Sequence, residues 1–347
     1  MKSKNFLKII KTLKSKGFKN IELDPVIESK YILKRSGENF RKYLFSFNSN
    51  SQDFSLIPDL SISSILKYAQ SNQNKKTKVF YTGSAFRKSY NRKNVVARQI
   101  GMEIFSSKNE NKDDKEIIDT SIKIVKNLGL KKFTVELNNF KLFELLIEKL
   151  PLAARWKARL IKFYWNQKYF LELLKRLESN SDIDPFQVEI DKKMFLKMKK
   201  ENPKKIIAGR NYQEIIQRYL AKINDPRNSK TGKYSAKIIK EFLKIECSLK
   251  DASKKLNNFY KKHNLNVFVE NGFFPVSNLK QKNINFKFST NIGRGREVTY
   301  YSSLIFLISV KEKNKIKNYI SGGRYNDLAS KTLGLKKISA VGAAVHI

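Results

Sequence analysis

Two pairs of polar residues have the types and the spacing needed to bind a small cationic molecule. Asp59 and Ser61 follow Pro58, and a carboxylate backed by a hydroxyl suits an ammonium ion. Gln99 and Glu103 are four residues apart, so on a strand their side chains point to the same face. There they could bind an amino group and an imidazole N–H. Taken singly, the first pair could be an ordinary Pro-Asp turn and the second the solvated face of a strand.

Other site chemistries find little support. The histidines are His263 and His346 and the single cysteine is Cys247, which gives no specific Cys–His nucleophile pair and no histidine-ligated metal site. The Gly-Arg-Gly-Arg run at 293–296 lacks the lysine and the strand–loop–helix context of a P-loop, so a flexible basic turn is the better interpretation. We therefore expect no catalytic residue, no metal and no cofactor.

The candidate residues fall on elements that the sequence pattern predicts. Residues 79–86 and 100–105 are expected to form two strands joined by a basic loop, and residues 43–47 and 54–57 a hairpin. Further strands are expected at 20–23, 133–137, 267–269, 284–289, 300–310 and 338–345. Helical periodicity marks 3–17, 60–69, 114–128 and 140–150, and a Gly-Gly turn is expected to precede a short helix at 325–331.

Strands at both ends of the chain, with helices between and around them, predict an α+β fold. Three parts are expected. Residues 1–150 form the first part of the main domain and residues 264–347 its second part. Residues 151–263 are mostly helical and strongly basic, and we interpret them as a helical insertion.

The charge and the apolar content of the chain limit its partners. Lys and Arg number 71 against 31 Asp and Glu, a net charge of +40. The lysines are spread along the whole chain instead of clustering with aromatic residues, so we attribute the charge mainly to compositional drift and expect no specific nucleic acid partner. No apolar run reaches the roughly 18 residues of a membrane span. The single cysteine fits a reducing cytoplasm, where we expect the protein.

Four segments, in order along the chain, resemble motifs of class II histidyl-tRNA synthetases. They are Leu56–Ser61, then Tyr81–Arg87 with Arg98–Phe105, then the tyrosine pair Tyr300-Tyr301 with the preceding glycines and arginines, and finally Gly322–Asn326. The resemblance covers about residues 1–145 and 265–347, and Pro25 stands where the family has a proline at its dimer interface. One such match is weak, but four in order are specific.

The resemblance implies a class II synthetase-like antiparallel sheet flanked by helices, and a histidine site. In the family the first motif binds the amino group of histidine, an arginine lies near its carboxylate, and a tyrosine lines the imidazole pocket. Counting back from the tyrosine pair places that arginine at Arg296, with Arg294 as the alternative. The implied histidine-binding residues are Asp59, Ser61, Arg87, Gln99, Glu103, Arg296, Tyr300 and Tyr301.

The sequence departs from an active synthetase where the family binds ATP. Val95-Val96-Ala97 replaces Arg-Glu-Phe, Ser89 replaces an acidic residue, and Leu307 replaces a glutamate. The sequence also stops near the position of the family's motif 3 arginine, and no anticodon-binding domain follows, so we expect no synthetase activity.

A histidine pocket without adenylation groups resembles the regulatory subunits of ATP phosphoribosyltransferase. That family is non-catalytic, forms dimers within a hetero-oligomer with the short-form catalytic subunit, and supports the first step of histidine biosynthesis. It confers feedback inhibition by L-histidine, the expected effector here. The alternative is a truncated histidyl-tRNA-synthetase paralogue that binds tRNA or activates an amino acid.

Overall fold

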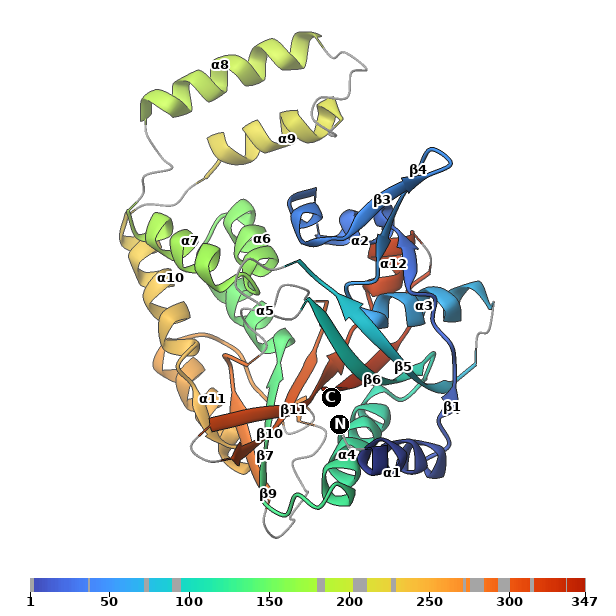
Figure 1. The fold of residues 1–347 in the computed structure, drawn as a ribbon. Helices are drawn as coiled ribbons and strands as arrows, with labels where there is room; N and C mark the ends of the chain where they lie inside the picture. Colours follow the sequence, from blue (N-terminus) through green and yellow to red (C-terminus); the bar gives the residue numbers. More distant parts are fainter. Residues whose placement is uncertain are drawn as a thin grey trace.

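One mixed sheet forms the centre of the computed structural model, and nine strands of the described residues belong to it (Figure 1). Across the sheet the order is β1 (Lys19–Asn20), β5 (Thr77–Phe86), β6 (Val96–Phe105), β12 (Ala340–His346), β11 (Lys315–Arg324), β10 (Leu304–Glu312), β7 (Phe133–Asn139), β9 (Ile284–Ser289) and β8 (Glu246–Ser248). Neighbouring strands are antiparallel except for β1–β5 and β7–β9. The expected α+β fold is therefore confirmed.

The structure describes residues 3–36, 38–71, 75–88, 95–179, 185–201, 211–225, 229–270, 273–274, 284–292, 300–312, 315–334 and 336–346. Within these ranges, no helix has both the length and the apolar content to cross a membrane. Arg296, predicted to lie near the histidine carboxylate, and its alternative Arg294 lie outside the described residues, as does Ser89.

A second, smaller sheet contains β2 (Val26–Glu28), β4 (Gln52–Leu56) and β3 (Ser46–Ser49). The turn between β3 and β4 has positive φ angles at Asn50 and Ser51, the geometry of a tight hairpin turn. The predicted hairpin is confirmed, although its first strand begins three residues later than expected.

Helices cover both faces of the large sheet (Figure 1). On one face, α1 (Ser3–Ser15) and α4 (Glu110–Asn127) bury apolar residues against the sheet in a first core. On the other face lie α2 (Ser29–Ser36), the 3-10 helix η1 (Glu38–Tyr43), α3 (Leu60–Gln70) and α12 (Leu328–Leu333), which form a second core. On β6, Met102 and Ile104 point into the first core and Phe105 into the second. This alternation directs Glu103 to the α3 face.

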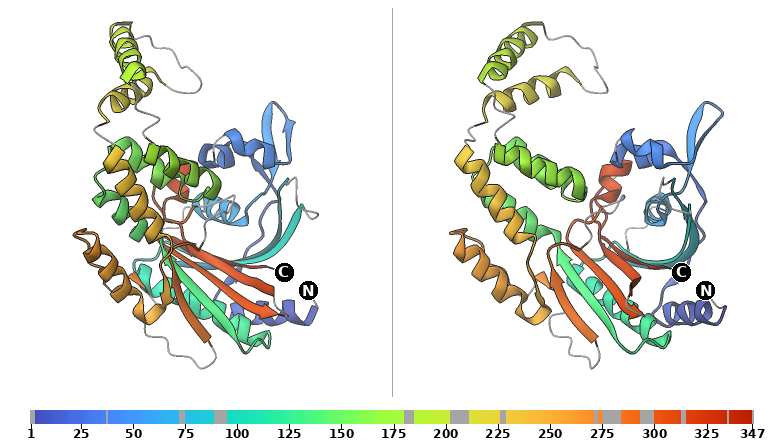
Figure 2. Two further views of the ribbon diagram at one scale, coloured as in Figure 1. Left: turned by 90° about the vertical axis from the view of Figure 1, so that its left-hand side faces the viewer. Right: turned by 60° about the vertical axis from the view of Figure 1, so that its left-hand side comes forward.

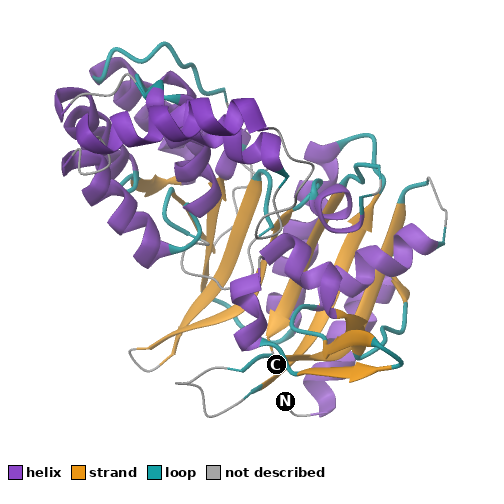
Figure 3. Ribbon diagram, turned by 90° about the horizontal axis from the view of Figure 1, so that it is seen from above, coloured by secondary structure: helices purple, strands orange, loops and turns teal. Residues whose placement is uncertain are grey.

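The segment expected as a helical insertion contains most of the remaining helices. They are α6 (Ala154–Phe163), α7 (Gln167–Ser179), α8 (Pro185–Glu201), α9 (Tyr212–Ile223), α10 (Ser229–Phe242), the 3-10 helix η2 (Leu249–Asp251) and α11 (Ala252–Lys262), preceded by α5 (Phe140–Lys149). Seen from above, the helices gather beside one end of the sheet (Figure 3). The segment also supplies the edge strand β8, and its boundaries as a separate unit stay a prediction.

Two predicted strands are shifted: the one expected at 20–23 is β1, which ends at Asn20, and the one expected at 300–310 is β10, which begins at Leu304. Two further local predictions are wrong. Residues 267–269 form no strand, because the side-chain amide of Asn257 binds both the N–H and the carbonyl of Val269 and so takes the groups that a strand ladder would use. Gly322 and Gly323 form no turn, because both lie inside β11, a strand the sequence pattern did not predict. A Cβ at Gly323 would lie 2.4 Å from the carbonyl oxygen of Leu304, so the glycines allow close packing within the sheet.

Candidate functional site

Glu103 lies at the centre of the candidate site and is almost completely buried, with 1% of its surface exposed. In the sheet it faces Val79 on β5 and Gly342 on β12. A Cβ on Gly342 would lie 1.3 Å from Glu103 Oε2, so the carboxylate lies directly over this glycine. The glycine therefore provides the space that holds the glutamate side chain.

Three hydroxyl groups donate hydrogen bonds to this carboxylate. Ser61 Oγ lies 2.9 Å and the Tyr81 hydroxyl 2.6 Å from Oε1, and the Tyr325 hydroxyl donates to Oε2. Burial raises the pKa of Glu103 to about 7, although the three hydrogen bonds act in the opposite direction. Burial also raises the pKa of Tyr81 and Tyr325 well above the usual value, so both remain neutral donors. The carboxyl group can therefore exchange its proton near neutral pH.

Asp59 supplies a second carboxylate at the start of α3. It caps the helix, because its Oδ1 accepts a hydrogen bond of 2.9 Å from the backbone N–H of Ser61. The Tyr300 hydroxyl donates to the same oxygen at 3.1 Å, and Arg87 Nη2 lies 3.5 Å from Oδ2. Arg87 is held by a 2.6 Å hydrogen bond from its Nε to the carbonyl of Pro58. Contacts with Ser61, Tyr300 and Arg87 therefore hold the Asp59 carboxylate in place.

Aromatic rings form one side of the site. The ring of Tyr300 lies 5.2 Å from that of Tyr325 and 5.3 Å from that of Tyr301. Tyr301 in turn lies 6.4 Å from Trp165, which comes from the turn between α6 and α7. Aromatic pairs at such distances and inclined angles are favourable. The side of the site therefore joins the sheet to the helical segment.

The structure brings together five of the eight predicted site residues through direct contacts: Asp59, Ser61, Arg87, Glu103 and Tyr300. Tyr301 packs against this group. Gln99 lies on the same face of β6 as Glu103, half-buried, and separated from it by Gly101, over which the ring of Tyr81 lies. Arg296 is outside the described residues. That these residues bind histidine stays a prediction.

Sequence reasoning missed three contributors to the site. Tyr81 and Tyr325 lie in the segments that resemble synthetase motifs, but the sequence pattern indicates no role for them, and it indicates none for Trp165. Tyr81 could have been found from strand pairing, because it faces Gly101, which has no side chain to occupy that space. Trp165 left no such signal, because only the fold brings it to Tyr301.

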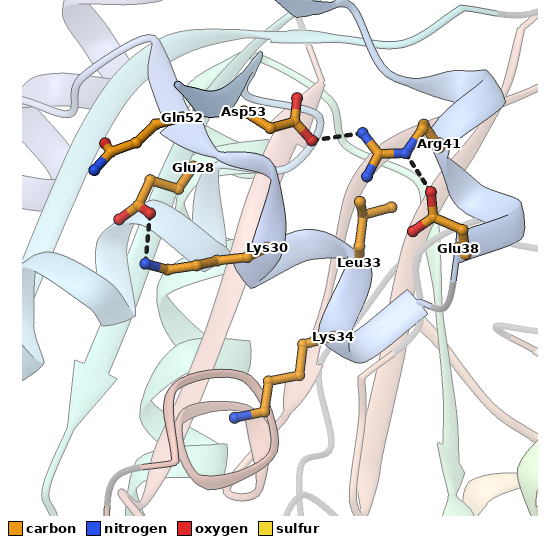
Figure 4. A pocket seen from close by; sticks show the side chains of 8 residues that line it. All are labelled: Glu28, Lys30, Leu33, Lys34, Glu38, Arg41, Gln52 and Asp53. Atoms are coloured by element: carbon orange, nitrogen blue, oxygen red, sulfur yellow. Dashed lines mark hydrogen bonds and ion pairs between the residues drawn. The ribbon is translucent and has the colours of Figure 1, made fainter. Parts of the chain in front are cut away.

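A separate cavity of about 470 Å³ opens beside the small sheet (Figure 4). Charged side chains line it and pair with one another. Lys30 lies 2.5 Å from Glu28, and Arg41 bridges Glu38 and Asp53. The cavity shares no lining residue with the site around Glu103, and its charges are largely paired within it, so we do not assign it a ligand.

The described part of the site offers groups that can bind a ligand. Two carboxylates, several hydroxyls and aromatic rings suit a small cation that carries an aromatic or heteroaromatic ring. The described part of the site contains one cation, Arg87, and it is already paired with Asp59.

Comparison with known proteins places the chain in a family. The family model described as histidyl-tRNA synthetase matches residues 3–347. An ATP phosphoribosyltransferase regulatory subunit from Sinorhizobium fredii is 22% identical over 95% of this chain and 91% of that protein. The regulatory subunit from Allorhizobium ampelinum is 24% identical over 93% and 90%. A histidine–tRNA ligase from Methanocaldococcus jannaschii is 23% identical over 99% and 70%.

Solved structures share the fold. Histidyl-tRNA synthetase from Nostoc sp. PCC 7120 matches with a TM-score of 0.61 at 15% identity, over 99% of this chain and 69% of that chain. A Bacillus halodurans protein described as an ATP phosphoribosyltransferase regulatory subunit/histidyl-tRNA synthetase matches with a TM-score of 0.56 at 16% identity, over 99% and 76%. The family match over nearly the whole sequence and the shared fold lead to one conclusion: the chain belongs to the histidyl-tRNA synthetase family.

Proposed function

We propose that this chain is a non-catalytic regulatory subunit of ATP phosphoribosyltransferase, the enzyme of the first step of histidine biosynthesis. Two relatives that match it over most of their length, from Sinorhizobium fredii and Allorhizobium ampelinum, carry that name. The observation that carries the proposal is the cluster of carboxylates and hydroxyls around Asp59 and Glu103, the latter on the same hairpin as Val95 and Val96, which stand where the resemblance to the synthetases implies charged residues.

The proposed effector is L-histidine, bound at the two carboxylates. The Asp59 carboxylate, which lies beside the hydroxyl of Tyr300 and the backbone N–H of Ser61, suits the ammonium group. The Glu103 carboxylate suits an imidazole N–H. The tyrosine rings would pack beside the imidazole. The residue proposed to pair with the histidine carboxylate is Arg296.

The proposal excludes amino-acid activation by this chain. Adenylation places charge on a leaving pyrophosphate, which an active site must stabilise with positioned cations. By the resemblance, the synthetases carry Arg-Glu at the start of the strand that corresponds to β6, whereas this chain carries Val95 and Val96 there, both exposed. Leu307 likewise replaces a charged residue on β10.

Regulation would follow from differential binding. If histidine binds one assembly state of the hetero-oligomer more tightly than another, it shifts the population toward that state and changes the activity of the catalytic subunit. We place the assembly, with this chain as a dimer inside it, in the cytoplasm. Its partner is the short-form catalytic subunit of ATP phosphoribosyltransferase.

The test uses the purified full chain and the short-form catalytic subunit from the same organism. We expect the chain to raise the rate of phosphoribosyl-ATP formation, L-histidine to lower it again, and the chain alone to show no histidine-dependent ATP–pyrophosphate exchange. Calorimetry with L-histidine measures the effector site directly. Absence of any effect on the catalytic subunit, or exchange by the chain alone, would overturn the proposal in favour of the synthetase-like alternative.

A further inference from the structure

Arg324 and Tyr325 are consecutive residues at the end of β11, and their side chains point to opposite faces of the large sheet. The Tyr325 hydroxyl donates to Glu103 Oε2 inside the candidate site. The Arg324 guanidinium instead contacts Asp114 of α4, which lies on the sheet face opposite to α3 and α12 (Figures 1 and 2). Because one planar peptide joins the two residues, the position of Arg324 constrains that of Tyr325.

Arg324 is completely buried, and each nitrogen of its guanidinium group donates a hydrogen bond. Nε donates to Asp114 Oδ1 at 2.8 Å, and Nη2 donates to the backbone carbonyl of Glu110 at 3.0 Å. Nη1 donates to Asn326 Oδ1 at 3.1 Å and to Ser339 Oγ at 2.9 Å. These contacts hold the planar guanidinium in one orientation.

Asn326 holds the other side of Tyr325. Its Nδ2 donates to Glu110 Oε1 at 2.6 Å, so the residues before and after the tyrosine are both bonded to α4. Its Oδ1 accepts the backbone N–H of Ala340 at 3.0 Å in addition to Arg324 Nη1. Tyr325 therefore lies between two neighbours that are each fixed to the rest of the fold.

The backbone of Arg324 also contacts the segment that follows the tyrosine pair. The backbone N–H of Ser302 donates to the Arg324 carbonyl at 2.7 Å, and Ser302 Oγ accepts the backbone N–H of Asn326 at 3.3 Å. Ser302 directly follows Tyr301 in the chain. The residues around Arg324 thus also help to place the aromatic side of the site.

Stability alone is a weak explanation for this buried ion pair. Removing two charges from water costs free energy that offsets their attraction, so apolar side chains of similar volume often give an equally stable protein. Asp114 shows the cost, because burial raises its pKa to about 6 while the charge of Arg324 acts in the opposite direction. What the pair does provide is geometry, because a guanidinium with every nitrogen bonded has little freedom to move.

We infer that Arg324, held by Asp114, is a positioning residue of the histidine site: it keeps the Tyr325 hydroxyl in place to donate to Glu103. The inference rests on the proposed function, in which Glu103 binds the imidazole N–H. The Tyr325 hydroxyl fills one acceptor position of Oε2 and so limits how the carboxylate can turn. A displaced hydroxyl would leave the carboxylate less fixed and more readily protonated.

The main experiment is a double-mutant cycle with full-length protein, in which calorimetry measures the affinity for L-histidine. The four proteins are the wild type, Arg324→Lys, Tyr325→Phe and the double variant. Lysine keeps the charge but not the planar fork, so we expect Arg324→Lys to bind at least about fivefold more weakly. In the Tyr325→Phe background the same change should cost less than about twofold, because no hydroxyl remains to be positioned.

Arg155→Lys is the matched control, because it makes the same change in another poorly exposed ion pair. Arg155 Nη2 lies 2.6 Å from Asp225 Oδ2, and the two side chains are 14% and 1% exposed. This pair joins α6 to the residues after α9, and its variant should bind L-histidine like the wild type.

A further variant, Arg324→Met/Asp114→Val, removes both charges together and leaves neither one buried alone. We expect it to fold, as thermal melts will report, and to lose at least as much affinity for L-histidine as Arg324→Lys, because the fixed geometry is gone.

The pH profile of L-histidine binding gives a readout that a merely structural pair would not move. The charge of Asp59 and three hydroxyl donors act on Glu103, those of Ser61, Tyr81 and Tyr325. Loss of the Tyr325 donor raises the pKa of Glu103, so on acidification the affinity of Arg324→Lys and of Tyr325→Phe should fall at a higher pH than that of the wild type. The titration of free histidine is common to all proteins and cancels in this comparison.

The outcomes separate the two proposals. If the wild-type chain does not bind L-histidine, the effector part of the proposed function fails and the positioning inference falls with it. If the wild type binds and regulates the catalytic subunit, three results would each overturn the positioning inference alone. These are wild-type affinity in the folded Arg324 variants, the same fold-loss with and without the Tyr325 hydroxyl, and an unchanged pH profile in Arg324→Lys.

Discussion

The two ends of the β5–β6 hairpin differ sharply in chemistry. At one end Glu103 is buried and accepts hydrogen bonds from Ser61, Tyr81 and Tyr325. At the other end Val95 and Val96 are exposed to solvent, where the synthetases carry charged residues. A valine side chain has no charge and no hydrogen-bonding group, so this pair cannot supply the polar contacts that adenylation needs. Under the proposed function, the groups that bind the amino acid are kept at one end of a pair of strands, and the groups that would activate it are replaced at the other end.

The largest effect is expected at the buried end. Glu103→Ala should weaken L-histidine binding at least about 100-fold, because it removes a hydrogen-bond acceptor and leaves the hydroxyls of Ser61, Tyr81 and Tyr325 without it. Calorimetry measures the change. Val96→Ala at the other end of the hairpin is the control and should bind like the wild type, so equal affinities for all three proteins would remove the contrast between the two ends.

The pH dependence of stability tests whether Glu103 is a buried carboxyl group with a raised pKa. Its pKa is raised from 4.5 to about 7 in the folded protein, so the folded state holds a proton that the unfolded state releases between these values. The contribution to stability is fully present below about pH 4.5 and is lost as the pH rises through about 7, an effect of about 3 kcal/mol. Urea unfolding from pH 4 to 8 should show this decline, and Glu103→Gln should make it shallower. A slope should remain in that variant, because burial also raises the pKa of Asp114, to about 6. The same slope in both proteins would contradict the assignment.

Gly342→Ala tests whether the space under the carboxylate is needed. The added methyl would lie 1.3 Å from Glu103 Oε2, so the side chain has to move. We expect the free energy of unfolding to fall by about 1–3 kcal/mol, with weaker histidine binding. Gly83→Ala on β5 is the control, because its methyl would meet only the flexible end of Leu60, at 3.1 Å. Equal losses for the two variants would show that the position over Gly342 is not special.

The smallest effect is expected at the exposed end. Val95→Arg/Val96→Glu restores the charge pattern of the synthetases, yet it changes surface side chains only and should alter stability by less than about 0.5 kcal/mol. Histidine affinity should stay the same, and ATP–pyrophosphate exchange should remain absent because other nucleotide groups are also replaced. ATP–pyrophosphate exchange by this variant would mean that Val95 and Val96 alone account for the missing adenylation activity.

The order of motifs along the sequence predicted much of the fold and the site. The strands that carry Glu103 and the helix that begins after Asp59 are present as expected, because alternation and capping are local properties. The two tyrosines that bind Glu103 come from β5 and from the residue after β11, and their convergence depends on strand order. Such pairings are non-local, so no pattern within a short window of sequence predicts them.

The errors have the same origin. Gly322 and Gly323 suggested a turn, because glycine is common in turns, but their role is set by Tyr301, Leu304 and Phe306 on neighbouring segments. Residues 267–269 have the composition of a strand, but the side chain of Asn257 binds the backbone there. In both cases a tertiary contact overrides the local preference.

The position of Trp165 beside Tyr301 has a spectroscopic consequence. The chain has two tryptophans, and the other, Trp156, is sealed inside the core. Fluorescence from Trp165 therefore responds to changes on the tyrosine side of the site, while Trp156 contributes a steady background. Ligand binding at the site could be followed by intrinsic tryptophan fluorescence without an attached dye. The Trp156→Phe variant would leave Trp165 as the single tryptophan.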